Sequence, residues 1–522
     1  MKQLNLTLPP EIAYNEEALK RYISTKISSI NQEEFTLRKL KRSIDARGKK
    51  IKIHLQAQVY LNEPIPPLTE YQLEYPDVSN ADPVVIVGAG PGGLFAALRL
   101  VELGYKPIVL ERGKDVQTRR RDLASINKDH VVNGESNYCF GEGGAGTYSD
   151  GKLYTRSKKR GSVRRILEIL VAHGAVDDIL VDTHPHIGTN KLPRIVANLR
   201  ESILKAGGEI HFDTKVTDFI LKEGEMKGVI TEEGDKIEGL GVILATGHSA
   251  RDIFVCLHQR DIYIEAKPFA LGVRIEHPQQ LIDQIQYNLA DRGDYLPASS
   301  YSLAAQVNQA GKQRGVFSFC MCPGGFIVPA ATASGEVVVN GMSPSRRNSK
   351  FANSGMVVSV VEEDLKPYEK HGALAGMYFQ QEIEQRSCQI AGETQTAPAQ
   401  KMRDFVQGKT SSQLLETSYQ PGLMSASIDE VLPSFISQSL RKGFQLFGKK
   451  MRGYLTNEAQ IVGVESRTSS PVRIPRDKDT FEHVQMKRLY PCAEGAGYAG
   501  GIMSAAIDGE KCAEKLIEKY GK

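Results

Sequence analysis

The stretch at residues 83–93, PVVIVGAGPGG, decides the fold class of this chain of 522 residues. Its apolar run predicts a strand that a parallel sheet buries on both faces. The glycines that follow have the GxGxxG spacing, at Gly88, Gly90 and Gly93. In this pattern the first glycine permits a tight turn, and the second lets the backbone approach a pyrophosphate. The third allows a helix to pack closely on the strand.

The residues around these glycines complete a βαβ unit. A helical stretch begins near Pro91 and closes at Gly104, and its N-terminus directs free N–H groups at bound phosphates. PIVLE follows as a second buried strand and ends at Glu111, 18 residues beyond Gly93. That offset is close to the roughly 20 residues expected for the acid that binds a ribose. The sequence therefore predicts a dinucleotide site.

Length and composition indicate a multidomain globular protein. A chain of 522 residues exceeds one ordinary core, and 41% hydrophobic with 25% charged residues argues against wholesale disorder. The net charge of +4 does not by itself imply nucleic acid or a membrane as a partner. The seven cysteines have no disulfide-framework spacing, which favours a reducing compartment. Because no membrane span or secretory signal is recognisable, we expect a cytoplasmic protein with no membrane partner.

Two distant segments resemble motifs of flavoproteins. GVILATG, which ends at Thr246 and Gly247, resembles the second conserved strand of flavoproteins with two dinucleotide-binding domains. LYPCAEGAGYAGGIMSAAIDG resembles their closing motif, in which an acid contacts the ribityl chain and a helix N-terminus faces the flavin pyrimidine. The resemblance implies FAD as the cofactor. It assigns the acid to Glu494, where many members carry Asp, and the amides to Gly501 and Ile502.

Most of the chain resembles the bacterial FAD-dependent dehydrogenase-like proteins, also called NAD(FAD)-utilising dehydrogenases, of the glutathione-reductase-like superfamily. The markers are KRSIDAR, GEGGAGTYSDGKL, HPHIGTNKLP, CMCPGG, NGMSPSRRNSKFANSG, GVESRTSSPVRI and EGAGYAGG. We expect an α/β fold with a Rossmann-like FAD-binding domain formed by residues 76–261 and 455–522. An α+β substrate domain at 262–454 is inserted into it. Residues 1–75 form a small α+β module of strand, helix, strand and strand, whose helix is capped by Asn15 and runs to Ile30.

Further cofactor contacts come from a glycine-rich loop and from arginines. The loop at 141–153 resembles one that passes beside the isoalloxazine ring. Arg112 and Arg119 can reach adenosine or pyrophosphate, because a guanidinium suits phosphate; a solvated RRR run is the alternative for Arg119. The predicted cofactor-binding residues are Gly88, Gly90, Pro91, Gly92, Gly93, Glu111, Arg112, Arg119, Gly144, Ala145, Gly146, Val216, Thr246, Gly247, Glu494, Gly501 and Ile502.

Two pairs of side chains are candidates for chemistry. His184 and His186 flank a proline in a loop and are predicted as a general acid or base, with an exposed turn as the alternative. Cys320 and Cys322 lie two apart on a strand, a spacing that does not favour an unstrained disulfide. We therefore interpret these cysteines as buried structural thiols rather than as a redox pair.

Two further observations bear on the substrate and the electron donor. Arg467 is predicted either to bind an anionic substrate or to pair with Glu465. The sequence has no convincing zinc ligand set, so no metal is predicted. It also has no second GxGxxG followed by a helix, so NAD(P)H either binds transiently as a donor or electrons arrive from elsewhere.

The favoured function is an FAD-dependent oxidoreductase, a dehydrogenase or reductase that transfers hydride between flavin and a small-molecule substrate. The alternatives are an FAD-dependent monooxygenase, a flavin-dependent RNA-modifying or nucleic-acid-binding protein, and a flavin sensor. The basic stretch at 38–52 supports the nucleic-acid alternative, but it lacks interleaved aromatic residues, so nucleic acid is not the expected partner. The N-terminal module either covers a sheet or contacts a partner or another subunit.

Overall fold

A five-stranded parallel sheet positions the predicted dinucleotide site. The structure is a computed structural model that describes residues 1–26, 35–61, 63–154 and 161–522. The strand order is β22 (Leu489–Pro491), β10 (Val242–Leu244), β4 (Pro83–Val87), β5 (Lys106–Leu110) and β6 (Glu209–His211). Parallel pairing places β4 beside β10 and β10 beside β22, although the three strands come from distant parts of the chain. The predicted α/β, Rossmann-like class is confirmed.

The two faces of this sheet are covered differently. Val84 and Ile86 of β4 pack toward α3 (Pro91–Glu102), α7 (Leu192–Lys205) and α14 (Ile502–Tyr520). Val85 and Val87 point the other way, toward α8 (Arg251–Gln259) and the antiparallel meander of β7 (Val216–Lys222), β8 (Glu225–Thr231) and β9 (Lys236–Glu238). Alternation along a strand buried on both faces explains this division.

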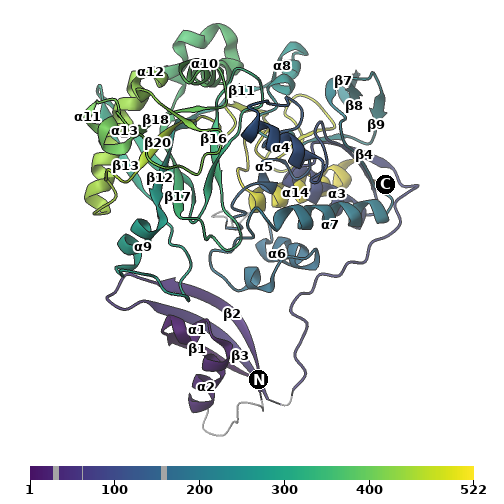
Figure 1. Ribbon diagram of the computed structural model, residues 1–522. Helices are drawn as coiled ribbons and strands as arrows, with labels where there is room; N and C mark the ends of the chain where they lie inside the picture. The colour runs from purple at the N-terminus through teal and green to yellow at the C-terminus, as the bar shows by residue number, and fades with distance from the viewer. Residues whose placement is uncertain (27–34, 62, 155–160) are drawn as a thin grey trace.

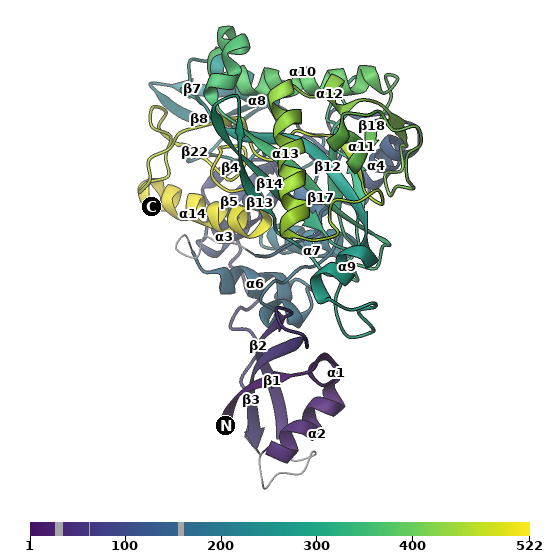
Figure 2. The same cartoon turned by 90° about the vertical axis from the view of Figure 1, so that its left-hand side faces the viewer.

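A second, seven-stranded sheet adjoins the first (Figures 1 and 2). Its order is β13 (Ala304–Gln309), β14 (Lys312–Cys322), β17 (Phe351–Val360), β12 (Phe269–Pro278), β20 (Gln460–Glu465), β18 (Ala397–Lys401) and β19 (Leu423–Ser425). The pairs are antiparallel except β18 with β19. Helix α13 (Ser434–Lys450) packs on it through Phe444, and α10 (Ala375–Ile390) through Phe379.

The sequence-based division at residue 454 does not follow the sheets. Strand β20, which that division gives to the closing part of the FAD-binding domain, pairs with β12 and β18 of the second sheet. The sequence QIVGVE is apolar and short, so its pattern does not reveal which sheet receives it.

The N-terminal module has the predicted strand, helix, strand and strand, with one further short helix after the first strand. Its elements are β1 (Lys2–Leu8), α1 (Pro10–Ala13), α2 (Glu16–Lys26), β2 (Phe35–Asp45) and β3 (Lys52–Leu61), with antiparallel sheet order β1-β3-β2. Asn15 caps α2, because its Oδ1 accepts the N–H of Ala18 at 3.0 Å; Ile30 lies outside the described residues. The module stands apart from the two large sheets and is joined to β4 by an extended segment (Figure 1).

Shorter elements complete the described part of the chain. They are α4 (Arg119–Lys128), α5 (Gly144–Thr147), α6 (Val163–Ala172), α9 (Gln279–Tyr287), α11 (Met402–Gln407), α12 (Ile428–Val431), β11 (Glu265–Ala266), β15 (Phe326–Pro329), β16 (Val339–Met342), β21 (Val472–Arg473) and the 3₁₀ helices Asp177–Leu180 and Glu362–Leu374. Among the helices described, none has both the length and the apolar character that crossing a membrane requires.

Candidate functional site

A cavity of about 420 Å³ opens at the carboxyl ends of the parallel strands. In an open α/β sheet this edge is where ligands bind. Its wall includes these predicted cofactor-binding residues: Gly88, Gly90, Pro91, Gly92, Glu111, Arg112, Gly144, Ala145, Gly146, Val216, Thr246, Gly247, Glu494, Gly501 and Ile502. Gly93, Arg119, His184 and His186 are not part of this wall.

The three motif glycines occupy different environments. Gly88 has a φ of 102°, and a Cβ there would lie 2.5 Å from the carbonyl oxygen of Ala245. A Cβ at Gly93 would lie 1.9 Å from the carbonyl oxygen of Gly88. A Cβ at Gly90 would meet no protein atom within 4 Å. The first and third glycines are therefore required by packing, whereas the second keeps the cavity open in front of α3.

Glu111 holds the turns that surround the cavity in place through hydrogen bonds to their backbone. Its Oε2 accepts the N–H of Ala89 at 2.8 Å, and its Oε1 accepts the N–H groups of Gly113 and Gly141, both at 2.9 Å. A carboxylate has about four acceptor positions, so one on Oε2 is left for a ligand hydroxyl. Glu111 therefore has a structural role, and the ribose contact stays a prediction with which the remaining acceptor position is compatible.

The two predicted arginines have different positions. Arg112 lies on the cavity wall, stacked at 4.6 Å over the ring of Phe140 and paired with Asp252 at 2.5 Å. This position suits a contact with the adenosine end of a dinucleotide.

Arg119 holds the glycine-rich loop from behind. It is fully buried and donates to the carbonyl oxygens of Asn137, Glu142 and Gly144 at 2.8, 2.9 and 3.0 Å. The solvated alternative is therefore wrong, whereas the phosphate contact stays a prediction, since Nη2 of Arg119 has no hydrogen-bond partner in the described part of the chain. The sequence RRR does not reveal this role. The three arginines begin helix α4, and only Arg119 among them is buried.

The opposite end of the cavity carries Glu494 and the N-terminus of α14. Oε1 of Glu494 accepts the N–H of Ser470 at 2.9 Å, and burial raises the pKa of the carboxyl group. A Cβ at Gly500 would lie 2.4 Å from Oε2 of Glu494, so the glycine is needed for this approach. Gly501 and Ile502 begin the helix at the cavity wall.

The residues present fit a dinucleotide cofactor. Oγ1 of Thr246 is buried, lines the cavity and has no hydrogen-bond partner within the protein. An orphaned buried hydroxyl of this kind indicates a ligand or water partner. Together with the open space at Gly90 and the acceptor left on Glu111, it supports a bound dinucleotide along this wall.

The predicted acid–base histidines are not part of the cavity wall but adjoin two of its residues, Tyr154 and Lys152. Nε2 of His186 donates to the carbonyl oxygen of Ser345 at 3.0 Å, and burial followed by the charge of Arg347 lowers its pKa. The ring of His184 lies 5.0 Å from that of Tyr154 and lines a separate surface pocket. The catalytic role of this pair stays a prediction.

His248 lines the cavity and was not identified from the sequence. Burial, then the charge of Arg467, lowers its pKa to about 4, so the imidazole is neutral at physiological pH. Its Nδ1 lies 2.8 Å from Oγ of Ser249. The sequence signal for His248 is its position directly after the segment ATG. Residues at that position lie at the carboxyl end of a strand of the parallel sheet.

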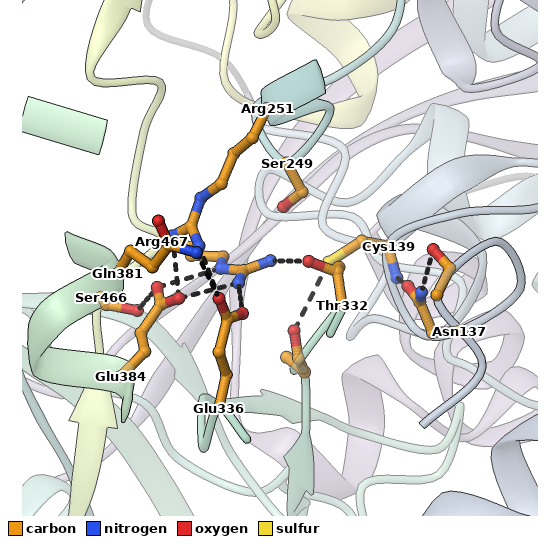
Figure 3. Close-up of polar contacts among 12 residues, drawn as sticks. Asn137, Cys139, Ser249, Arg251, Thr332, Glu336, Gln381, Glu384, Ser466 and Arg467 are labelled. Atoms are coloured by element: carbon orange, nitrogen blue, oxygen red, sulfur yellow. Dashed lines mark hydrogen bonds and ion pairs between the residues drawn. The ribbon is translucent and has the colours of Figure 1, made fainter. Parts of the chain in front are cut away.

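Arg467 belongs to a buried network of two arginines and two glutamates (Figure 3). Its Nη2 donates to Glu336 and to Glu384, each at 2.8 Å. Arg251 donates to the same two carboxylates, at 3.0 and 2.8 Å. This network joins α8 of the parallel-sheet part to α10 beside the second sheet.

The predicted pair with Glu465 is therefore wrong, whereas the contact with an anionic substrate stays a prediction, since Arg467 lines the cavity. Its other terminal nitrogen is engaged as well, since Nη1 donates to Thr332 at 2.6 Å. Glu465 pairs instead with Arg274 at 2.8 Å. The Arg467 guanidinium is held by the protein, and its role is to fix the second sheet against the cofactor site.

Comparisons with known proteins identify a family. A family model described as "FAD-dependent protein, C-terminal domain-like" matches residues 268–468, and a domain of unknown function matches residues 1–60. An uncharacterized protein of Clostridium beijerinckii is 38% identical over 100% of this chain and 98% of its own length. The thiamine thiazole synthase of Methanococcus maripaludis is 29% identical over 36% of this chain and 65% of its own length.

Solved structures give a weaker likeness. CtdE in complex with FAD and a substrate has a TM-score of 0.34 at 12% identity, over 84% of this chain and 82% of its own. Glycine oxidase from Bacillus cereus has a TM-score of 0.31 at 13% identity, over 84% and 95%. Such values support no inference about activity. With the family model and the full-length relative, the chain belongs to this family of FAD-dependent proteins, the family that its motifs resemble, and FAD is its cofactor.

Proposed function

We propose that this FAD-dependent enzyme is an oxidoreductase that transfers hydride between its flavin and a small-molecule substrate. One observation carries the proposal: the cavity lined by the FAD-binding turns is also lined by Phe319 and Cys320 of β14 and Asn340 of β16. A substrate held against the second sheet would therefore share a cavity with the cofactor. The flavin, when bound, supplies the hydride chemistry, and the protein supplies position and charge.

The proposed cofactor contacts divide along the cavity. Gly90 and the N-terminus of α3 receive the pyrophosphate. Glu111 binds a ribose hydroxyl, and Glu494 binds the ribityl chain. The N-terminus of α14, at Gly501, stabilises negative charge on the pyrimidine end of the reduced flavin without a side-chain cation.

Lys152 is the proposed substrate-orienting residue. It lines the cavity, and its Nζ lies 3.9 Å from Oδ2 of Asp150. Asp150 is already engaged by Arg347, at 3.0 and 2.5 Å, so the positive charge of Lys152 is only partly compensated. Burial opposes its charge, but the neighbouring thiols and Asp150 raise the pKa of Lys152. A protonated lysine here would bind a carbonyl or carboxylate oxygen of the substrate.

NADH or NADPH is proposed as a transient electron donor. The described residues contain one sheet that combines parallel strands with a GxGxxG turn, and that turn lines the FAD site. A nicotinamide nucleotide would then bind without a second Rossmann domain and leave before the substrate enters.

The test is an absorption spectrum of the purified protein, followed by anaerobic titration with NADH and with NADPH. We expect a flavin band that bleaches with one of the two nucleotides. A bound flavin that neither nucleotide reduces would contradict the proposed donor. Fast reaction of the reduced flavin with oxygen, coupled to hydroxylation of a substrate, would instead support a monooxygenase.

The nucleic-acid alternative gains little from the N-terminal module. Within its basic stretch, Arg42 pairs with Asp182 at 2.7 Å and Arg47 pairs with Asp45 at 2.8 Å. Arg42 is thus buried and used within the protein, whereas Arg47 stays exposed. Salt-dependent binding of RNA by the purified protein would revive this alternative.

A further inference from the structure

We propose that Cys320 and Cys322 form a redox-active dithiol that faces the cavity and exchanges an electron pair with bound FAD. The inference rests on the proposed oxidoreductase function and adds to it a second redox centre, built from protein side chains. It replaces the sequence-based interpretation of these cysteines as structural thiols.

A bulge in the backbone places the Cys322 side chain against the peptide of Cys320. Strand β14 pairs Phe319 with Gly355 and Cys322 with Asn353, so the register shifts between these positions. Cys320 lies in this bulge with a φ of 43°, in the left-handed region that non-glycine residues rarely adopt. The regular alternation that argues against a disulfide at this spacing is therefore absent. The thiol of Cys322 points back and donates to the carbonyl oxygen of Cys320 at 3.3 Å.

The pair has one member in the cavity and one behind it. Cys320 lines the cavity together with Lys152 and Asn340, whereas Cys322 is fully buried. A cavity ligand can thus reach Cys320, and Cys322 is placed to attack or to resolve a bond at the Cys320 sulfur. Residues with a strained backbone conformation of this kind cluster at active sites and ligand-binding sites.

Two cations stabilise negative charge on this sulfur pair. Arg274 is fully buried and donates through Nη2 to the carbonyl oxygen of Cys320 at 2.7 Å and to Sγ of Cys322 at 3.5 Å. Lys152 donates through Nζ to the carbonyl oxygen of Met321, between the two cysteines. The acids nearby are already paired, Glu465 with Arg274 and Asp150 with Arg347.

The pKa values agree with this arrangement. A hydrogen bond from the Cys322 thiol, then the charges of Lys152 and Arg274, holds the pKa of Cys320 well below its usual range despite burial. The same hydrogen bond, then burial, raises the pKa of Cys322. The two opposite shifts favour the thiolate form at Cys320, in the cavity, over the thiolate form at Cys322. A thiolate next to a thiol is the combination that thiol–disulfide chemistry uses.

The redox step balances without a further reactant. The Cys320 thiolate and the Cys322 thiol lose two electrons and one proton as the Sγ–Sγ bond forms. The electron pair and a proton are taken up by oxidised FAD, and the reverse step restores the dithiol. The disulfide closes a ring over a single intervening residue, so we expect it to be strained and easily reduced.

Two measurements on the FAD-loaded protein test this inference. In the first, wild type is oxidised, freed of oxidant, denatured, alkylated with iodoacetamide and digested with trypsin. Residues 315–346 form one tryptic segment that contains both cysteines and no other. We expect this peptide to be unalkylated and lighter by two hydrogens than the reduced peptide. Recovery of the doubly alkylated peptide from oxidised protein would overturn the proposal, whether or not any variant folds.

The second measurement counts reducing equivalents in an anaerobic dithionite titration. Wild type should take up twice as many equivalents per FAD as Cys320→Ser or Cys322→Ser. Cys139→Ser is the matched control, because Cys139 lines the same cavity, and it should behave as wild type. Equal uptake by wild type and Cys320→Ser would overturn the dithiol. Dithionite does not depend on a nicotinamide site, so a failure of NADH and NADPH to reduce the flavin would count against the proposed donor alone.

Discussion

A Cβ atom on Gly93 would lie 1.9 Å from the carbonyl oxygen of Gly88. The two ends of the phosphate turn are thus in direct contact, and helix α3 starts as close to strand β4 as the backbone allows. At Gly90, between them, a Cβ would have no protein atom within 4 Å. The three glycines should therefore differ in what their replacement changes.

Replacement of Gly90 by alanine should weaken FAD binding and leave folding nearly intact. The added methyl group projects into the cavity, so we expect at least a roughly tenfold rise in the FAD dissociation constant, about 1.4 kcal/mol. Loss of glycine at the helix N-cap should lower the free energy of unfolding of the apoprotein by no more than about 1 kcal/mol. Flavin fluorescence titration and urea unfolding measure the two quantities.

Gly93→Ala is the contrasting variant. Its methyl group would overlap a backbone oxygen, so the apoprotein itself should lose about 1–3 kcal/mol or more. Equal stability losses in Gly90→Ala and Gly93→Ala would contradict the division of roles between the glycines.

Glu111→Gln should destabilise the protein even without FAD. The carboxylate accepts three backbone N–H groups, and an amide nitrogen cannot accept any of them. Leaving buried donors unpaired should lower the free energy of unfolding by about 1–3 kcal/mol. Glu238→Gln is the control, since Glu238 forms an exposed pair with Lys222 and should cost no more than about 1 kcal/mol.

Arg467→Met should be among the most destabilising substitutions on the cavity wall. It leaves Glu336 and Glu384 buried with one arginine between them, at an expected cost of about 3–5 kcal/mol in urea unfolding. Adding Glu384→Gln should recover part of this loss. Arg386→Ala, which removes an exposed pair with Glu382, should change stability by about 1 kcal/mol or less. A double variant less stable than the sum of its single changes would refute the shared network.

Stability should fall on acidification because His277 is buried in its neutral form. Burial lowers its pKa to about 4, and its Nε2 donates to the carbonyl oxygen of Tyr454 at 2.9 Å. Between pH 6.5 and 4 the unfolded chain binds a proton that the folded protein does not. The stabilisation is complete above about pH 6.5 and is lost as the pH falls toward 4, by about 3 kcal/mol.

His277→Gln should remove this part of the pH dependence. Urea unfolding at a series of pH values should give a shallower decline than wild type, whatever the variant's stability at neutral pH. His258→Gln, at an exposed position on α8, serves as the control. A His277→Gln curve parallel to that of wild type would show that the decline arises elsewhere.

Arg42→Ala should release the N-terminal module from the rest of the protein. Arg42 is 7% exposed and pairs with Asp182 at 2.7 Å and Asp178 at 3.1 Å, both outside the module. We expect limited proteolysis in the segment at 63–82 to accelerate several-fold. Arg47→Ala should leave the rate unchanged, because Arg47 is 90% exposed and pairs within the module.

The sequence by itself determined the cofactor turn and its partners. Three local patterns predict this turn: the apolar run before Gly88, the GxGxxG spacing and the offset to Glu111. Few folds other than a dinucleotide-binding βαβ unit combine a strand buried on both faces with such a glycine turn. The strands at Thr246 and Glu494 followed from resemblance to flavoproteins. The structure places these residues on one cavity wall, which is consistent with the predicted assembly from distant segments.

Only the tertiary structure decided what the polar residues do. Arg119 turns inward to hold a loop, Arg467 pairs with glutamates far away in sequence, and β20 joins the second sheet. The bulge that places Cys322 against the peptide of Cys320 depends on pairing with a strand more than 30 residues away. Local sequence determines which residues of a helix or strand are buried, because the apolar residues recur with a fixed period. The partner of a charged group or a thiol depends instead on which distant segments of the chain lie next to each other.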